Sequence, residues 1–168
     1  PEFVRAYACV KQAAARANRE IGALDAGRAG LIDAACEEIK AGRLLDEFTV
    51  GVVQGGAGTS KNMNVNEVVT NRALELGGWE KGAYDHLNPN DHTNRSQSTN
   101  DTYPTAVKIA LAFSLKSLTS ELGLLAEAFA AKGAEFAHIV KVGRTQRHDA
   151  VPMTLGQEFT AIAVTLQE

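Results

Sequence analysis

Cysteine is scarce in this sequence, and clusters of positive charge are absent. The two cysteines, Cys9 and Cys36, are too few for a disulfide framework and match no metal-binding spacing. We therefore expect a reducing, cytoplasmic setting and no metal ion. The formal net charge is -3 and lysine and arginine are dispersed, so nucleic acid is not an expected partner.

Long apolar runs are also missing. The longest is far shorter than a membrane span requires, so no membrane is expected as a partner. Hydrophobic residues still make up 45% of the 168 residues and charged residues 22%, which is typical of a soluble chain that can bury a core. The chain begins at Pro1 without a methionine and stops inside an apolar helical pattern, so we expect a piece of a longer protein.

Apolar residues recur every three or four positions along much of the chain, which predicts a mostly α-helical fold. The expected helices cover residues 1–21, 25–43, 62–76, 103–136 and 153–168. Asp25 is suited to cap the second helix, and Thr154 with Gln157 resembles a capping box for the last. On the first helix, the apolar stripe that should face the core consists of Phe3, Tyr7, Val10, Ala14, Ala17 and Ile21.

The expected helix at residues 62–76 has an unusual polar face. It carries Asn62, Asn64, Asn66 and Asn71. Asparagine is a poor helix former, and a face exposed only to solvent is better served by glutamate or lysine. These side chains therefore predict hydrogen bonds to neighbouring loops.

The longest pattern, residues 103–136, is close to a heptad seam. At 1.5 Å per residue such a helix is about 50 Å long, which is too long to be covered by one small core. We expect it to be buried on several sides in a multi-helix bundle, between subunits. The organisation predicted is an N-terminal helical domain over residues 1–97, with short extended segments, that leads at residues 98–168 into the start of a central bundle of long helices.

Two stretches favour extended structure. Residues 48–53 are rich in β-branched side chains and predict a short buried strand or an extended segment. Residues 139–146 alternate in character and predict a strand or one arm of a hairpin, which residues 147–152 then leave. On such a strand, His148 would face the same side as Gln146, two positions earlier.

A glycine-rich segment precedes the expected helix at residues 62–76. Gly55, Gly56 and Gly58 allow positive φ angles and a close approach to a neighbour. Their spacing matches neither a phosphate-binding P-loop nor a dinucleotide fingerprint, so no nucleotide cofactor is expected. Thr59 can present a hydroxyl to a ligand, although the segment taken alone favours a plain turn.

The most polar stretch, residues 88–104, runs directly into the longest helical pattern. Ser98, Thr99 and Asn100 place two hydroxyls and an amide at a helix start, where free N–H groups and the helix dipole favour an anion. Ser98 to Asp101 also resembles a capping box, and a helix start that caps itself can still hold an anion. This stretch therefore predicts a carboxylate-binding site.

Three separated stretches together resemble the fumarase/aspartase superfamily. They are residues 55–67, residues 88–104, and residues 143–146 with 149–158. The resemblance covers essentially the whole chain, and the three motifs in this order are specific in a way that none is alone. It implies a mostly helical homotetramer, whose core contains long helices from all four subunits and whose active sites lie where three subunits meet.

The reaction that the resemblance implies is a reversible anti-elimination that gives fumarate. Removing a proton beside a carboxylate creates a dianionic aci-carboxylate, which requires hydrogen-bond donors aimed at its oxygens. The residues that match substrate-binding positions of the family are Thr59, Ser98, Thr99, Asn100, Thr145 and Gln146. Secondary candidates are Asn88, Asn90, Asp91 and His148, the last with a minor electrostatic role.

Two positions favour the aspartase branch of this superfamily. Fumarases carry histidine where this chain has Asn88 and Gln146, and aspartases would take L-aspartate to fumarate and ammonia. Arg147 and His148 depart from the usual Leu-Gln pair of aspartases. The catalytic base of the family is a serine on a downstream glycine-serine loop, so we expect no catalytic residue in this chain and no activity from it alone. The alternatives are a class II fumarase and a non-catalytic helical oligomerisation module.

Overall fold

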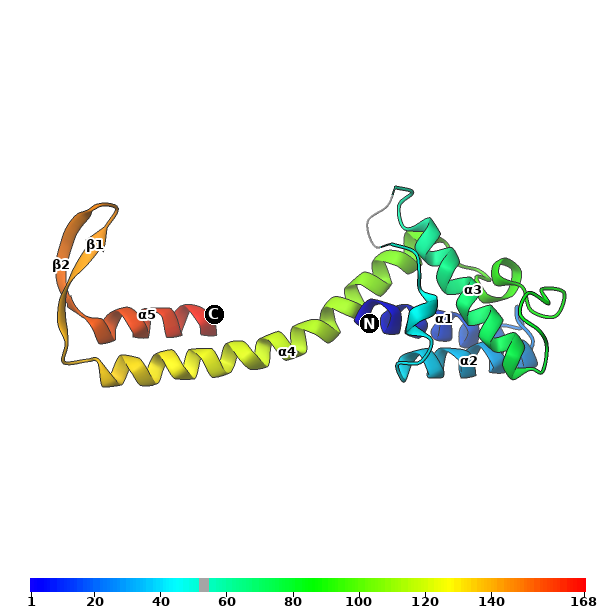
Figure 1. The fold of residues 1–168 in the computed structure, drawn as a ribbon, viewed down its shortest axis with the longest axis horizontal. Coiled ribbons are helices and arrows are strands. Elements are labelled where there is room, and N and C mark those ends of the chain that lie inside the picture. Colours follow the sequence, from blue (N-terminus) through cyan, green and yellow to red (C-terminus); the bar gives the residue numbers. More distant parts are fainter. Residues whose placement is uncertain (52–54) are drawn as a thin grey trace. The chain divides into compact units, whose positions relative to one another are not determined.

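The computed structural model describes residues 1–51 and 55–168, which form a mainly helical chain (Figure 1). Its elements in order are α1 (Glu2–Glu20), α2 (Ala26–Lys40), the short 3-10 helix η1 (Leu45–Glu47), α3 (Thr59–Leu76), the π-helical turn η2 (Pro89–Thr93), α4 (Thr99–Glu135), β1 (Val140–Thr145), β2 (His148–Thr154) and α5 (Leu155–Gln167). Each expected helix is present, with ends that differ by a few residues. The predicted mostly α-helical class is confirmed.

The chain divides into two compact units, Pro1–Phe113 and Ser114–Glu168. The division falls inside α4, which begins in the first unit and ends in the second. The predicted domain boundary between residues 97 and 98 lies just before the first residue of α4 and stays a prediction.

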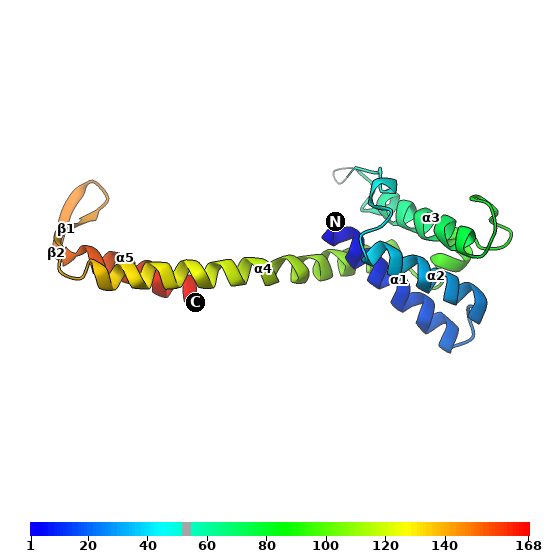
Figure 2. The same cartoon turned by 60° about the horizontal axis from the view of Figure 1, so that its bottom comes forward.

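In the first unit α1 packs along α2, and α2 packs along α3 (Figures 1 and 2). The largest fully buried apolar side chains are Tyr7, Ile32, Ile39, Val65, Val69, Leu74 and Leu87. The expected core face of α1 was partly wrong, because Ile21 is 76% exposed. The buried face includes Lys11, Gln12 and Asn18, so a stripe drawn through apolar residues alone is rotated away from it.

Two predicted helix caps are confirmed. The Asp25 side chain accepts a hydrogen bond from the backbone N–H of Arg28 at the start of α2, 2.9 Å away. Thr154 Oγ1 accepts from the N–H of Gln157, and Gln157 Oε1 accepts from the N–H of Thr154, which completes a capping box for α5. These caps satisfy N–H groups that the first turn of a helix leaves without intrahelical partners.

Of the two forms predicted for residues 48–53, the strand is not found where the structure describes the chain. Residues 48–51 follow η1 without forming a strand, and residues 52 and 53 lie outside the described residues. The carbonyl oxygen of Val50 accepts a hydrogen bond from Lys61 Nζ at 2.7 Å instead of pairing with another strand. A side chain from α3 thus satisfies this backbone group.

Residues 147–152 do not leave the strand as predicted. β1 and β2 form an antiparallel hairpin in which Thr145 pairs with His148 and Val142 with Pro152. Gln146 has a φ of 51° at the turn, which the side-chain alternation did not signal. A two-stranded hairpin has free edges, so Pro152 is tolerated although it lacks an N–H to donate.

In the second unit the end of α4 packs against α5. The ring of Phe159 lies between those of Phe129 and Phe136, with centroids 5.5 and 5.3 Å apart. A Cβ on Gly156 would lie 2.4 Å from the carbonyl oxygen of Gly133, so the two backbones approach closely because neither position carries a side chain.

Most of α4 is uncovered within this chain. Leu111, Leu118 and Leu124 are each more than half exposed, at 56%, 53% and 59%. The helix contains an 18-residue window with a mean hydropathy of 1.4, of which 6% is buried, so by length and composition it could cross a membrane. That criterion is also met by a helix that other protein helices cover, which is the arrangement predicted from the heptad seam.

Candidate functional site

The first turns of α3 and α4 lie side by side. Asn62 on α3 donates from Nδ2 to Oγ1 of Thr99 on α4, at 3.0 Å. Just before α3, Gly58 has a φ of 82°, and a Cβ there would lie 2.4 Å from the ring of Tyr103. The glycine therefore allows the α3 start, including the exposed Thr59, to sit against α4. The structure brings Thr59 into the same neighbourhood as Thr99.

At the α4 start, two hydroxyl oxygens accept hydrogen bonds from the protein. Ser98 Oγ accepts a hydrogen bond from the backbone N–H of Asn100 at 3.2 Å, whereas the N–H of Asp101, the partner expected in a capping box, donates to the Ser98 carbonyl oxygen. Thr99 Oγ1 accepts from Asn62. Neither hydroxyl hydrogen has an acceptor among the residues that the structure describes, so both are available to a ligand. Ser98 and Asn100 are exposed and Thr99 is half-buried.

The secondary candidates before α4 have structural partners. Asn88 Oδ1 accepts from the N–H groups of Asn90 and Asp91, at 2.8 and 3.1 Å, and so caps η2. The N–H of Asn88 donates to His92 Nδ1 at 2.8 Å. Burial lowers the pKa of His92, which favours the neutral ring that this acceptor role requires. The side chains of Asn90 and Asp91 are exposed.

Sequence reasoning missed the residue at the centre of this region, Lys11 on α1. The side chain is fully buried. Its Nζ donates to Asn62 Oδ1 at 2.8 Å, Asn94 Oδ1 at 3.0 Å and Gln97 Oε1 at 2.9 Å. A signal was present, because Lys11 lies four residues after Tyr7 on the buried face of α1.

Burial dominates the electrostatics of Lys11. Loss of solvation lowers the pKa of its ammonium to about 7. On α2, the Cys36 thiol stays neutral because burial raises its pKa to about 12. The Tyr7 ring lies 5.6 Å from Lys11 Nζ, and burial raises the pKa of its hydroxyl. Among the described residues, Lys11 has hydrogen-bonding amides around it but no carboxylate partner.

The predicted residues Thr145, Gln146 and His148 belong to the second compact unit. All three are exposed, and Gln146 occupies the hairpin turn with positive φ. The prediction that His148 shares a strand face with Gln146 was wrong. Thr145 and His148 are instead direct partners across the hairpin, so these two side chains share a face.

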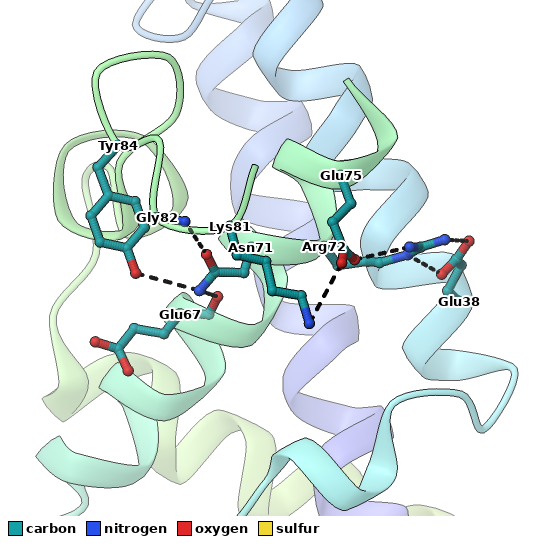
Figure 3. A network of polar contacts seen from close by, with 8 residues as sticks. All are labelled: Glu38, Glu67, Asn71, Arg72, Glu75, Lys81, Gly82 and Tyr84. Atoms are coloured by element: carbon teal, nitrogen blue, oxygen red, sulfur yellow. Dashed lines mark hydrogen bonds and ion pairs between the residues drawn. The ribbon is translucent and has the colours of Figure 1, made fainter. Parts of the chain in front are cut away.

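A second polar cluster is centred on Asn71 and Arg72 of α3 (Figure 3). Arg72 donates to both carboxylate oxygens of Glu38, at 2.6 and 3.0 Å, and to Glu75 at 3.0 Å. Asn71 Oδ1 accepts from the N–H of Gly82 at 2.8 Å. These contacts tie α3 to α2 and to the connector after it. They confirm that asparagines on this helix bind neighbouring loops.

No group of three or more histidine, cysteine, aspartate or glutamate side chains suited to a metal ion occurs within residues 1–51 and 55–168. The polar side chains that converge on the α3 and α4 starts are hydroxyls, amides and one ammonium. Such a set provides donors for an anionic oxygen. The arrangement is therefore suited to hold a carboxylate.

The chain is similar to known proteins over its whole length. Residues 2–168 match the lyase family. The chain is 54% identical to aspartate ammonia-lyases of Pseudomonas fluorescens and of Escherichia coli strain K12, and covers 35% of each. It is thus about a third as long as these relatives.

Two solved structures are also similar. A fumarate lyase:delta crystallin from Brucella melitensis, in native form, is 54% identical with a TM-score of 0.92, and the match covers 99% of this chain and 39% of that one. A class II fumarase from Schistosoma mansoni is 36% identical with a TM-score of 0.89, over 99% of this chain and 35% of that one.

Proposed function

The chain belongs to the lyase family, within the fumarase/aspartase superfamily, and we propose that it is part of an aspartate ammonia-lyase that converts L-aspartate reversibly to fumarate and ammonia. The observation that carries this proposal is the pair of hydroxyls at the start of α4, Ser98 and Thr99, whose oxygens accept hydrogen bonds from the protein and whose hydrogens have no acceptor among the described residues. They are neutral donors for a carboxylate whose charge increases during the reaction. A relative's identity of 54% over the whole chain supports the ammonia-lyase branch.

In this proposal the substrate carboxylate next to the acidic carbon lies against Ser98, Thr99 and Asn100, with Thr59 from the start of α3. Loss of the Cβ proton places a second negative charge on that carboxylate, so hydrogen bonds that strengthen with charge lower the barrier. In this proposal the proton acceptor belongs to a part of the full-length protein outside these residues. Expulsion of ammonia then completes fumarate.

Thr145 and Gln146 are proposed as further substrate contacts. Gln146 has no ionisable proton, so it can hold an amino or carboxylate group by hydrogen bonds without acting as a proton relay. Its positive φ of 51° is a strained conformation for a residue with a side chain, which is often found at binding sites. Asn88 and Gln146 together favour this branch over a class II fumarase.

A homotetramer in the cytoplasm completes the proposal. The exposed leucines of α4 are a surface that other subunits would cover. Active sites shared between subunits would then allow Thr145 and Gln146 of one subunit to act with Ser98 and Thr99 of another. The cytoplasmic setting rests on the low cysteine content.

The test uses the full-length protein that carries this chain. Fumarate formed from L-aspartate is followed by its ultraviolet absorbance, and L-malate is the competing substrate for the fumarase alternative. The substitution Thr99→Val is expected to lower kcat/KM for L-aspartate by roughly 100-fold, because one oxyanion donor is lost. Thr105→Val is the control, since the Thr105 hydroxyl donates to the Asp101 carbonyl within α4.

The outcomes separate the candidate functions. Turnover of L-malate without L-aspartate identifies a fumarase. Turnover of L-aspartate that Thr99→Val leaves unchanged contradicts the assigned site. A full-length protein that assembles but turns over neither substrate supports the non-catalytic oligomerisation module.

A further inference from the structure

The buried ammonium of Lys11 controls which way three side-chain amides face. An ammonium carries three hydrogens and no lone pair, so it can only donate. Its partners are the oxygens of Asn62, Asn94 and Gln97, at 2.8 to 3.0 Å. In a side-chain amide the oxygen and the NH2 group are bonded to the same carbon and point in different directions. When the amide oxygen faces the ammonium, the NH2 group therefore points toward other partners.

The orientation of the Asn62 amide determines how Asn62 is hydrogen-bonded to Thr99. Its oxygen also accepts from the Tyr7 hydroxyl at 3.2 Å. Its nitrogen is therefore left to donate, and it donates to Thr99 Oγ1 at 3.0 Å and to Asn94 Oδ1 at 3.1 Å. Thr99 Oγ1 is therefore an acceptor inside the protein. Nothing in the part of the chain that the structure describes accepts the remaining hydrogen of Thr99, which is free for a ligand.

Asn94 and Gln97 hold the segment that leads into α4. Asn94 Nδ2 donates to the carbonyl oxygen of Gln97 at 3.1 Å, and Gln97 Nε2 donates to that of Thr93 at 2.9 Å. These bonds form because both amide oxygens face Lys11. The same cation thus orients the backbone immediately before Ser98.

The ammonium of Lys11 also has no negatively charged partner among the described residues. The titratable groups that face it are Tyr7 on its own helix and Cys36 on α2, and both are neutral at physiological pH. The side chains from α3 and from the segment before α4 are amides. A buried positive charge without a counter-ion attracts an anion far more strongly than an exposed one.

We propose that Lys11 is a positioning residue of the carboxylate-binding site. When protonated, Lys11 fixes the direction of the hydrogen bond from Asn62 to Thr99, so that the Thr99 hydroxyl donates to the substrate carboxylate. In that form it also supplies uncompensated positive charge to the site. The inference deepens the proposed function and rests on it.

The decisive variant is Asn62→Asp in the full-length enzyme. Aspartate still accepts from Lys11, but it neutralises the charge and has no N–H to donate to Thr99. The Thr99 hydroxyl then turns inward to donate to Asp, and the ligand loses its donor. The KM for L-aspartate and the inhibition constant of succinate, a dicarboxylate without an amino group, are both expected to rise at least about tenfold.

Lys11→Met is the second variant, and Lys40→Met is the matched control. Lys40 donates to Gln12 and Glu37, and neither partner connects to Thr99. Lys11→Met is expected to weaken succinate binding in the same direction, whereas Lys40→Met stays within about twofold of the unaltered enzyme. A merely structural role for Lys11 would reduce the amount of active enzyme and leave the succinate constant unchanged.

Succinate constants of folded Asn62→Asp or Lys11→Met within twofold of the unaltered enzyme overturn the proposal. If neither variant folds, the pH dependence of succinate binding to the unaltered enzyme tests the proposal. Its succinate constant should rise as the pH increases above about 7, where Lys11 loses its proton, and a flat profile from pH 6.5 to 9 overturns the proposal. Turnover of L-malate instead of L-aspartate would refute the proposed substrate but leave the succinate measurement valid.

Discussion

At Lys11 an ammonium is surrounded by amide oxygens instead of carboxylates. Burial stabilises the neutral form of a lysine, whereas three accepting oxygens suit the charged form. A carboxylate partner in this place would hold the lysine charged but would cancel its field. The amides orient the hydroxyl of Thr99 and leave the charge available, so this residue is better suited to anion binding than to stability.

The low pKa of Lys11 predicts a pH dependence of stability. The unfolded chain keeps this proton up to about pH 10.5, but the folded protein releases it near pH 7. Between these values the unfolded state binds more protons, so the free energy of unfolding should rise with pH by about 1.4 kcal/mol per unit at most. Urea unfolding of the full-length protein at pH 7, 8 and 9 measures this slope.

The substitution Lys11→Met should remove that slope, because the titrating group is gone. Lys40→Met should keep it. Equal slopes in the unaltered protein and in Lys11→Met would show that Lys11 does not lose its proton on folding.

At the scale of elements, the site depends on how closely α3 approaches α4. Gly58 and Gly78 have the same φ of 82°, but they differ in their surroundings. A Cβ on Gly58 would meet the Tyr103 ring, whereas a Cβ on Gly78 has nothing within 4 Å. Substituting each glycine with alanine therefore distinguishes the effect of backbone strain, which both positions share, from the effect of packing, which only Gly58 adds.

Gly78→Ala is expected to lower the free energy of unfolding by about 1 kcal/mol through strain at positive φ. Gly58→Ala should lower it by about 2 kcal/mol or more, because the Tyr103 ring must also move. Displacement of Thr59 should in addition raise the KM for L-aspartate only in Gly58→Ala. Equal changes in stability and KM for the two variants would mean that the contact with Tyr103 does not position the site.

At the scale of the whole molecule, α4 presents apolar side chains that this chain leaves uncovered. Leu111, Leu118, Leu124 and Leu125 are exposed. Each leucine buried by another subunit contributes about 1.5 to 3 kcal/mol. This surface is the physical basis for the proposed homotetramer.

Leu118→Lys in the full-length protein is expected to shift the assembly toward smaller species, since each copy would bury a charge without a partner. Sedimentation velocity at micromolar protein measures the shift, and Lys116→Gln on the same helix is the control. Activity should fall together with the tetramer, because the proposed sites are shared. An unchanged tetramer would place the subunit contacts elsewhere.

Much of the helical architecture follows from local chemistry. The caps at Asp25 and Thr154 were predictable because a capping side chain binds N–H groups two or three residues away. The polar start of α4 was equally predictable from the sequence, since Ser98, Thr99 and Asn100 are consecutive. The hairpin turn was not, because a positive φ at Gln146 is atypical of glutamine and leaves no mark in the alternation of side chains.

The sequence by itself determined the positions of the helices, their caps and the hydroxyls at the start of α4, because these depend on neighbours within a few residues. Only the tertiary structure decided what those hydroxyls are bonded to. Lys11 reaches Asn62 and Gln97 across 51 and 86 positions of the chain, and Asn62 reaches Thr99 across 37. Contacts over such separations depend on how α1, α3 and α4 pack, and that packing sets the direction of each hydrogen bond.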